Sequence, residues 1–216
     1  MASAAVDNDV VLKAACYRFG SGLLRSVPPG TQVYGALGAA KYVLPRALKR
    51  RMLADESAAE AELATVLDSL EVLEPDDVEQ ALASEIEFTA QRDGLPIDSG
   101  ESQLLAIAIN REFHHVLTGD KRAISALPKI AGVVTKLDAL KLRIVCFEQA
   151  VRWLLLSAGE AAVRAAICAE PSVDASMRAS FSCASISPKP GSSLLGLESQ
   201  IRHLRATSGE FLKEDH

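Results

Sequence analysis

The chain has few aromatic residues and no long hydrophobic run. Phe, Trp and Tyr make up 5% of its 216 residues, so a platform of aromatic rings that stack on nucleic-acid bases is not expected. No stretch approaches the roughly 18 consecutive apolar residues of a membrane span. Asp7 and Asp9 stand where a signal peptide needs an apolar core. We therefore expect a cytoplasmic protein that has no membrane partner.

Cysteine pairs at zinc-ligand spacing and a strongly basic charge are also missing. No CxxC pair occurs, and no histidine lies at zinc-ligand spacing from any of the four cysteines, Cys16, Cys146, Cys168 and Cys183. Cysteines that lack the spacing of metal ligands are expected to be buried thiols in a reducing compartment. The net charge is −5, which argues against a basic coat for nucleic acid but allows a local basic patch. The first apolar run is not followed by a glycine-rich phosphate loop, so a doubly wound α/β protein that binds a small ligand or nucleotide is a distant alternative.

Short apolar runs alternate with helical patterns along the first two thirds of the chain. Strands are expected at residues 4–6, 43–45, 70–73, 115–118 and 144–147. Helical patterns occupy residues 10–27, 57–69, 76–91 and 122–127, and a further helix begins at Asp98 or Ser99. This alternation predicts an α/β fold of three layers, with a mostly parallel central sheet flanked by helices.

The last third of the chain has a different pattern. Two helical segments, at residues 148–169 and 194–212, surround a Pro- and Ser-rich linker at residues 182–193. We therefore divide the chain into an α/β domain of residues 1–147 and a helical C-terminal extension of residues 148–216.

Carboxylates lie at the ends of the expected strands and helices. Asp7 and Asp9 follow the first strand, and Asp120 follows the strand at residues 115–118. Glu101 lies in the first turn of a helix. Acids at such positions converge at one edge of a parallel sheet, and they repel one another unless a hard cation such as Mg²⁺ neutralises them. The pattern predicts a metal site and phosphoryl-transfer chemistry, with metal ligands Asp7, Asp9, Glu101 and Asp120.

A simpler structural role remains open for these residues. Aspartates such as Asp7 and Asp9 favour turns and helix N-termini. Asp98 and Glu101 have the spacing of a capping box. Thr118 either orients a ligand or a water molecule, or satisfies nearby backbone groups.

Two groups of basic residues are candidates for contact with a phosphate backbone. Lys121 and Arg122 follow Asp120 directly and are well placed to meet a scissile phosphate. A second group lies upstream and consists of Arg46, Lys49, Arg50 and Arg51. This second group either binds a phosphate backbone or forms a solvated helix face.

The order of these motifs resembles that of the PIN-like nucleases, a family that includes the toxins of many bacterial toxin–antitoxin pairs. The resemblance is carried by Asp7-Asn8-Asp9-Val10-Val11-Leu12, by Gly100-Glu101 with the apolar helix after it, and by Thr118-Gly119-Asp120-Lys121-Arg122. It covers about residues 3–130, and residues 98–122 are its specific part. The resemblance implies a PIN-like fold and an endoribonuclease dependent on Mg²⁺ or Mn²⁺. The catalytic residues that it implies are Asp7, Glu101 and Asp120.

One position departs from the family pattern. These nucleases usually carry a glutamate on the second helix, in a context like Pro-x-x-Val/Leu-x-Glu, and Arg50 stands at that place in this chain. Glu56, Glu60 and Glu62 are substitutes in a shifted register, and the sequence does not choose among them. Losing one ligand weakens a Mg²⁺ site without abolishing it, because Mg²⁺ often keeps several waters. The alternative function is a degenerate PIN-like module that binds RNA or a protein without cleavage.

The resemblance also implies partners. RNA is the expected substrate, and the residues expected to bind it are Thr118, Lys121, Arg122, Arg46 and Arg50. A toxin would have an antitoxin protein as its partner, and a homodimer is a further option. The extension exceeds the compact form of the family, so it either docks a partner or covers the site.

Overall fold

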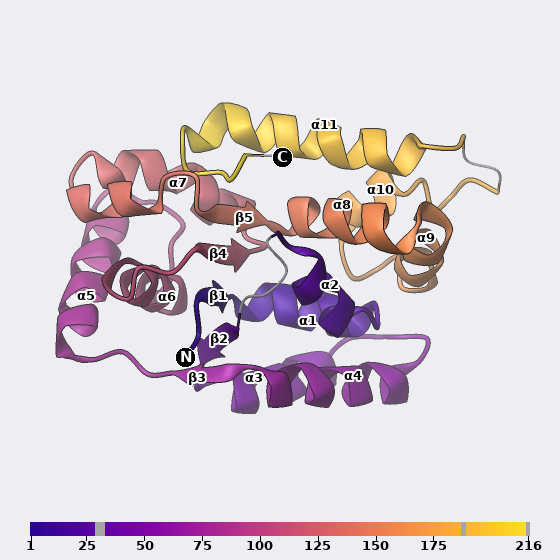
Figure 1. The fold of residues 1–216 in the computed structure, drawn as a ribbon, viewed down its shortest axis with the longest axis horizontal. Helices are drawn as coiled ribbons and strands as arrows, with labels where there is room; N and C mark the ends of the chain where they lie inside the picture. The colour runs from indigo at the N-terminus through magenta and orange to yellow at the C-terminus, as the bar shows by residue number, and fades with distance from the viewer. Residues whose placement is uncertain (29–32, 187–188, 215–216) are drawn as a thin grey trace.

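A five-stranded parallel sheet forms the centre of the computed structural model, which describes residues 1–28, 33–186 and 189–214 (Figure 1). The strands are β1 (Ala4–Val6), β2 (Tyr34–Leu37), β3 (Glu71–Leu73), β4 (His115–Thr118) and β5 (Ile144–Cys146). They lie in the order β3-β2-β1-β4-β5, and each neighbouring pair is parallel. The predicted α/β fold with a central parallel sheet is confirmed.

The order of the strands reverses beside β1. Ala4 of β1 pairs with Tyr34 of β2 on one side and with His115 of β4 on the other. The chain runs from β1 through β2 to β3 in one direction, and then continues as β4 on the opposite side of β1. In open α/β sheets, ligands bind outside the carboxyl ends of the strands at such a reversal. A ligand site is therefore expected at the carboxyl end of β1, next to β4.

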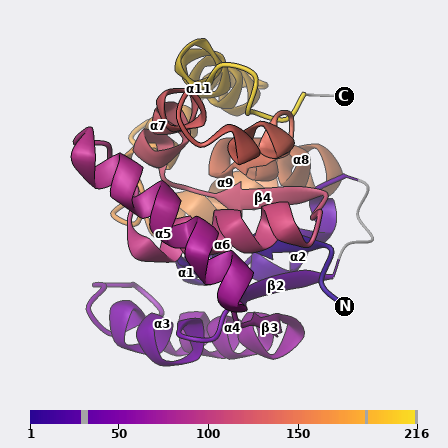
Figure 2. The ribbon, with the colours of Figure 1, turned by 90° about the vertical axis from the view of Figure 1, so that its left-hand side faces the viewer.

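Helices cover both faces of the sheet, and Figure 2 shows α5 and α6 in front of the strands. Successive residues of β1 point to opposite faces, so Ala4 and Val6 belong to one hydrophobic cluster and Ala5 to the other. The first face carries α1 (Asn8–Cys16), α2 (Gly20–Ser26), α3 (Ala40–Leu48), α4 (Glu56–Ser69), α8 (Phe147–Ala158), α9 (Glu160–Ala169) and α10 (Ala175–Ser180). The second carries α5 (Asp77–Arg92), α6 (Ser99–Asn110), α7 (Lys121–Ala131) and the 3-10 helix η1 (Thr135–Leu140). The last helix, α11 (Ser192–Ser208), contributes to both clusters.

Two expected long helices are each broken into two. The pattern at residues 10–27 folds as α1 and α2, because Arg18 has a φ of 60° and leaves the helical region. The pattern at residues 148–169 folds as α8 and α9 around Gly159, whose φ is 90°. The hydrophobic periodicity continues across both breaks, because the helices on either side of each break pack an apolar face against the same hydrophobic cluster.

The expected strand at residues 43–45 is wrong. These residues lie inside α3, and β2 takes the place of that strand in the sheet. Leu44 and Leu48 are buried four residues apart, which is the spacing of one helix face. The other expected strands and helices occur, with ends that differ by a few residues. Part of the expected linker, residues 187–188, lies outside the described residues.

The C-terminal extension packs against the same core as the sheet. Val151, Met177 and Phe181 join Val6 of β1 in one hydrophobic cluster. At the edge of the sheet, Leu212 forms a parallel β-bridge with Ile144 of β5. No helix in the described part of the chain has both the length and the apolar character that a membrane span requires. The division between residues 147 and 148 stays a prediction.

Two of the four cysteines form a disulfide. Cys168 and Cys183 are 15 residues apart in sequence, and folding brings their Cα atoms to 5.1 Å. The expectation of four reduced thiols is therefore wrong for this pair, whereas Cys16 and Cys146 are buried and lie outside the disulfide. Sequence spacing alone could not reveal the contact, because it depends on how α9 and α10 turn toward each other. The cysteines thus no longer support the prediction of a reducing compartment.

Candidate functional site

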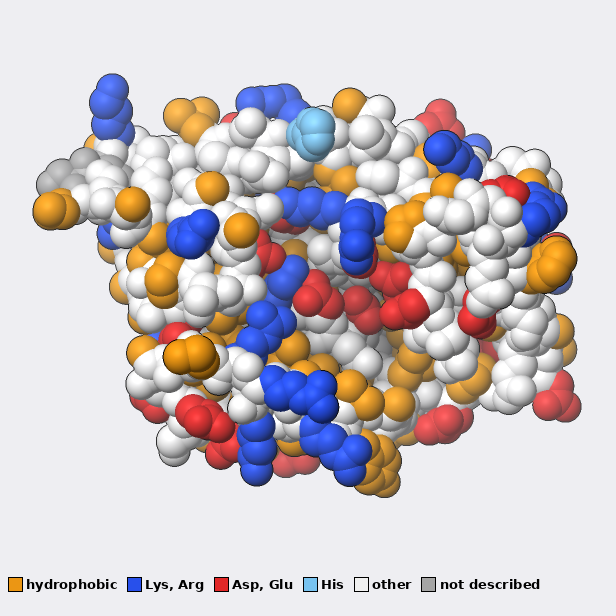
Figure 3. Space-filling model, turned by 180° about the vertical axis from the view of Figure 1, so that it is seen from behind, with side chains coloured by type: hydrophobic (Ala, Val, Ile, Leu, Met, Phe, Trp, Pro, Cys, Tyr) orange, Lys and Arg blue, Asp and Glu red, His pale blue; other side chains and the backbone are white. Residues whose placement is uncertain are grey.

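An acidic hollow lies at the carboxyl ends of β1 and β4, and Figure 3 shows it as a group of red side chains near the centre of one face. Its volume is about 590 Å³. The carboxylates that line it are Asp7, Asp9, Asp98, Glu101, Asp120 and Asp174. The hollow therefore occupies the reversal of strand order, which is where an α/β sheet forms its ligand sites. The four predicted metal ligands all line it.

Asp7 and Asp120 each lie where a strand passes into a helix. Asp7 follows β1 and caps α1, and its carboxylate accepts a hydrogen bond from the Asn8 N–H at 2.7 Å. Asp120 follows β4 and caps α7, where it accepts hydrogen bonds from the N–H groups of Arg122 at 2.8 Å and Ala123 at 3.2 Å. The N-terminus of a helix favours a negative charge. Parallel pairing of β1 with β4 brings the two caps to the same edge of the sheet.

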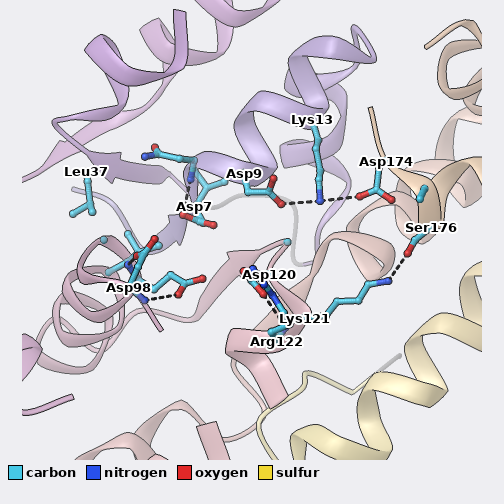
Figure 4. Close-up of a pocket in the computed structure, with 17 residues that line it drawn as sticks. Asp7, Asp9, Lys13, Leu37, Asp98, Asp120, Lys121, Arg122, Asp174 and Ser176 are labelled. Atoms are coloured by element: carbon cyan, nitrogen blue, oxygen red, sulfur yellow. Dashed lines mark hydrogen bonds and ion pairs between the residues drawn. The ribbon is translucent and has the colours of Figure 1, made fainter. Parts of the chain in front are cut away.

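Asp98 and Glu101 form the capping box that their spacing predicts. The Glu101 N–H donates to Oδ1 of Asp98 at 2.8 Å, and the Asp98 N–H donates to Oε2 of Glu101 at 3.0 Å. Each hydrogen bond uses one carboxylate oxygen, and both side chains also line the hollow; Asp98 is labelled in Figure 4. A capping role is therefore compatible with a role in binding a cation.

Asp9 and Asp174 share a lysine on the other side of the hollow. The Nζ atom of Lys13 lies 2.8 Å from a carboxylate oxygen of each (Figure 4). Burial opposes the charge of Lys13, but the two carboxylates raise its pKa. Gly119 leaves room for Asp9, since a Cβ atom at that position would overlap the carboxylate. Asp9 is thus held against Lys13 rather than directed at the other acids.

Thr118 lies between two of the acids. Its hydroxyl makes a long contact of 3.4 Å with Oδ2 of Asp7 and accepts a hydrogen bond from the Asp120 N–H at 3.3 Å. The side chain is buried and is not among the residues that line the acidic hollow. Of its two predicted roles, the contacts observed are those that satisfy local groups, and contact with a ligand stays a prediction.

The carboxylates influence one another's ionisation. Burial, with the charges of Asp9 and Asp98, raises the pKa of Asp7 to about 6. Burial also raises the pKa of Glu101 to about 8, and the charges of Asp98, Asp120 and Asp7 add to the effect. Acids that raise each other's pKa in this way are stabilised as anions by a nearby cation.

Asp120 is already paired with a cation. Arg122 lies 3.1 Å from Oδ2 of Asp120, and its side chain is 78% exposed. Burial alone would raise the pKa of Asp120, but the hydrogen bonds from Arg122 and Ala123 lower it. Within the residues that the structure describes, no group of three or more His, Cys, Asp or Glu side chains is arranged to hold a metal ion. The oxygen donors suit a hard cation in their chemistry, although they are not gathered into a set of ligands.

Lys121 lines the hollow, but its ammonium group is directed toward the extension. It lies 2.5 Å from Oε1 of the buried Glu148 and 2.8 Å from Oγ of Ser176. Oε1 of Gln200 is a further acceptor, at 3.2 Å. Figure 4 shows the contact with Ser176. The extension therefore forms one wall of the hollow. Whether it also docks a partner or covers the site stays a prediction.

The upstream basic residues do not line the hollow. Arg46 lies in α3 and Arg50 follows it, and both are exposed. Figure 3 shows Lys and Arg side chains around the acidic hollow, including a group over α3. These side chains form a basic surround, and Arg46 and Arg50 lie outside the lining of the hollow itself.

The acid expected on the second helix is not replaced by its three predicted substitutes. Glu56, Glu60 and Glu62 do not line the hollow. Glu62 instead accepts a hydrogen bond from the Ser21 N–H at 3.0 Å, and Glu60 lines a separate groove between α3 and α4.

Sequence reasoning did not assign Asp98, Asp174 and Lys13 to the site. The sequence already indicated that Asp98 caps the helix that carries Glu101. An acid that caps this helix lies at the same sheet edge as Glu101, so its position could have assigned Asp98 to the site. Asp174 and Lys13 carry no such signal, because Asp174 comes from the extension and its pairing with Lys13 depends on packing.

In comparisons with family models, curated proteins and solved structures, nothing matches this chain. The resemblance to PIN-like nucleases therefore rests on the motifs of the sequence. It stays a prediction, to be judged by the chemistry of the hollow.

Proposed function

We propose that this chain is a PIN-like endoribonuclease that depends on Mg²⁺ or Mn²⁺. The observation that supports the proposal best is the position of Asp7, Glu101 and Asp120, which come from separate segments and line one hollow at the sheet edge. Their charges interact, and as a result Asp7 and Asp120 both contribute to the raised pKa of Glu101. A divalent cation bound by oxygen ligands would relieve this repulsion.

The three acids hold the cation, and the neighbouring groups keep them in place. The capping hydrogen bonds use one oxygen of Asp7 and one of Glu101. The other oxygen of each would bind the cation, with Oδ2 of Asp7 also in contact with Thr118 at 3.4 Å. Asp120 would be a third ligand, and Arg122, which now pairs with its carboxylate, would instead hold the substrate phosphate. When bound, Mg²⁺ or Mn²⁺ supplies activation of a water for in-line attack and stabilisation of the leaving oxygen.

An anionic substrate reaches an acidic hollow only if basic groups guide it there. Arg122 lines the hollow and is exposed, and Arg46 and Arg50 are exposed in α3 and just after it. Arg and Lys side chains provide most of the nonspecific affinity for a phosphate backbone. RNA as the substrate, an antitoxin partner and a homodimer are parts of the proposal that rest on the motif resemblance alone. A cytoplasmic location is a further part, and it rests on the composition of the sequence.

A second candidate is a degenerate module that binds RNA or a protein without cutting it. It is favoured by the pairing of Arg122 with Asp120 at 3.1 Å, which places an internal cation where a metal would act. Arg50 at the position of the family's usual glutamate points the same way. In this reading the acids cap helices and the basic surround carries the binding.

Calorimetric titration with Mn²⁺ and an RNA cleavage assay test the proposal together. The proteins compared are the wild type, the Asp7→Asn plus Asp120→Asn double variant, and Asp76→Asn as a control. Asp76 caps α5 away from the hollow, and Asn caps a helix about as well as Asp. All three proteins should therefore fold alike.

The wild type and the control are expected to bind Mn²⁺ and to cleave single-stranded RNA. The double variant should bind Mn²⁺ at least about tenfold more weakly, because it has lost two anionic ligands, and should not cleave. Wild-type protein that binds RNA without cleaving it in Mn²⁺ would establish the second candidate instead. Absence of Mn²⁺ binding by the wild type would overturn the metal-dependent mechanism.

A further inference from the structure

The part of the extension that lines the hollow is enclosed by the disulfide. Asp174, Ala175 and Ser176 all line the hollow, and they lie between Cys168 and Cys183. Asp174 caps α10, where its Oδ1 accepts a hydrogen bond from the Met177 N–H at 3.0 Å. Its other oxygen, Oδ2, pairs with Lys13 at 2.8 Å. A covalently closed segment thus places an anion inside the site.

Asp174 lies in the field of two lysines. Burial opposes the ionisation of Asp174, but the charges of Lys13 and Lys121 both help to lower its pKa. Ser176, two residues further on, contacts the ammonium group of Lys121 at 2.8 Å. A phosphate group offers charged oxygen acceptors like those of a carboxylate, and lysine binds phosphate as a compact point charge. The oxygens of Asp174 and Ser176 therefore lie where phosphate oxygens would be bound.

Each lysine also has a partner that is independent of the enclosed segment. Lys13 pairs with Asp9 at 2.8 Å, and its ammonium lies 5.5 Å from the centre of the Phe147 ring. Lys121 pairs with Glu148. These partners hold both ammonium groups at the wall of the hollow if Asp174 moves away.

We propose that Lys13 and Lys121 form a phosphate-binding pair beside the acid cluster, which Asp174 occupies as an internal anion held there by the Cys168–Cys183 disulfide. The inference rests on the proposed function, which supplies a phosphodiester as the ligand. Reduction by a dithiol breaks the S–S bond. Two electrons and two protons then pass to the cysteine sulfurs, and the dithiol becomes its own disulfide. The enclosed segment loses its covalent closure, and phosphate displaces Asp174 more readily.

Lysine acylation followed by peptide mass spectrometry tests the pair, with inorganic phosphate as the probe. In Asp174→Asn, acylation of Lys13 should be roughly threefold faster or more than in the wild type, as expected when an ion pair is removed. Lys121, whose own ion pair is with Glu148, should change in the same direction but less. Phosphate should then protect both lysines. The matched control is Asp138→Asn, which removes one of the two exposed carboxylate partners of Lys141 and should leave Lys13 and Lys121 unchanged. Unchanged labelling in Asp174→Asn, or labelling that phosphate does not slow, would overturn the phosphate pair.

The role of the disulfide is tested on the wild-type chain, oxidised and after reduction by a dithiol. Amide hydrogen exchange of residues 174–180 and acylation of Lys13 and Lys121 should both become faster on reduction. If neither changes, the disulfide does not hold Asp174 in the site and that part of the proposal fails. The Cys168→Ser plus Cys183→Ser variant repeats the comparison without a reductant. These measurements need neither metal nor RNA, so their failure is distinguishable from a failure of Mn²⁺ binding or RNA cleavage.

Discussion

Single carboxylates in the hollow combine helix capping with mutual repulsion. Asp7 and Asp120 accept backbone hydrogen bonds at the start of a helix, and Glu101 accepts one from the Asp98 N–H. These bonds stabilise the charged form of each acid, whereas burial and neighbouring charges oppose it. The balance differs from residue to residue: the pKa of Asp120 is lowered, but that of Glu101 is raised to about 8. Glu101 is therefore the acid whose ionisation gains most from a cation.

The raised pKa of Glu101 predicts that stability falls as the pH rises. Its pKa is about 8 in the folded chain against 4.5 for an ordinary glutamate, so the folded state binds more protons than the unfolded state between these values. The free energy of unfolding of the metal-free protein should then decrease from about pH 5 to about pH 8, by roughly 1–2 kcal/mol after allowance for solvent screening. Urea denaturation across this range measures the slope.

Two comparisons assign that slope to Glu101. Glu101→Gln removes the titrating group and should flatten the pH dependence, whereas Mn²⁺ should reverse it in the wild type, because metal competes with protons for the carboxylate. Glu101→Gln with the full wild-type slope would show that another group is responsible. Asp7, with a pKa of about 6, contributes in the same direction over the lower part of the range.

At the scale of elements, α5 and α6 begin with the same motif in different surroundings. Each starts with an Asp-x-x-Glu capping box, formed by Asp76 with Glu79 and by Asp98 with Glu101. Glu79 is fully buried and pairs with Arg111 at the end of α6, at 2.8 Å. Glu101 instead faces the hollow. The same local sequence thus joins two helices in one case and lines a candidate site in the other.

Removing the Glu79 side chain should loosen the packing of α5 against α6. Glu79→Ala leaves Arg111 and Asn110 without the carboxylate that they bind. The expected loss is about 2–4 kcal/mol, less than for a fully buried pair because water reaches part of Arg111. Glu85→Ala, at an exposed position of the same helix, should change stability by less than about 0.5 kcal/mol. Urea denaturation of both variants decides the matter, and equal effects would contradict the role of the buried pair.

At the scale of the whole molecule, the extension is part of the core that supports the site. Phe181 is fully buried in the cluster that also contains Val6 of β1. Lys121 joins α7 to α8 and α10 through Glu148 and Ser176. Residues on both sides of position 147 therefore depend on each other for their positions.

Phe181→Ala tests whether residues 1–147 and 148–216 unfold together. The substitution removes a buried aromatic ring and should cost about 3–5 kcal/mol. The whole chain should lose stability in one transition. Fluorescence of Trp153, the single tryptophan and part of α8, should coincide with far-UV circular dichroism during unfolding. Two separate transitions, with only the fluorescence shifted by the substitution, would instead establish two independent domains.

The sequence by itself determined the alternation of strands and helices and the positions of the principal acids along the chain. Hydrophobic periodicity and capping residues are local signals, so β1, β4 and α6 could be predicted, and with them Asp7, Glu101 and Asp120 at the sheet edge. The helix breaks at Arg18 and Gly159, two single residues with positive φ, were not predicted, because the apolar pattern continues across them.

Only the tertiary structure decided which distant residues meet. The pairing of Lys13 with Asp174, the disulfide between Cys168 and Cys183, and the exclusion of Arg50 from the hollow all depend on how separate elements pack. A hydrophobic pattern specifies which face of an element is buried, but not which other element covers that face. The sequence therefore placed the acids at one edge of the sheet, and the packing of the extension supplied the wall opposite them.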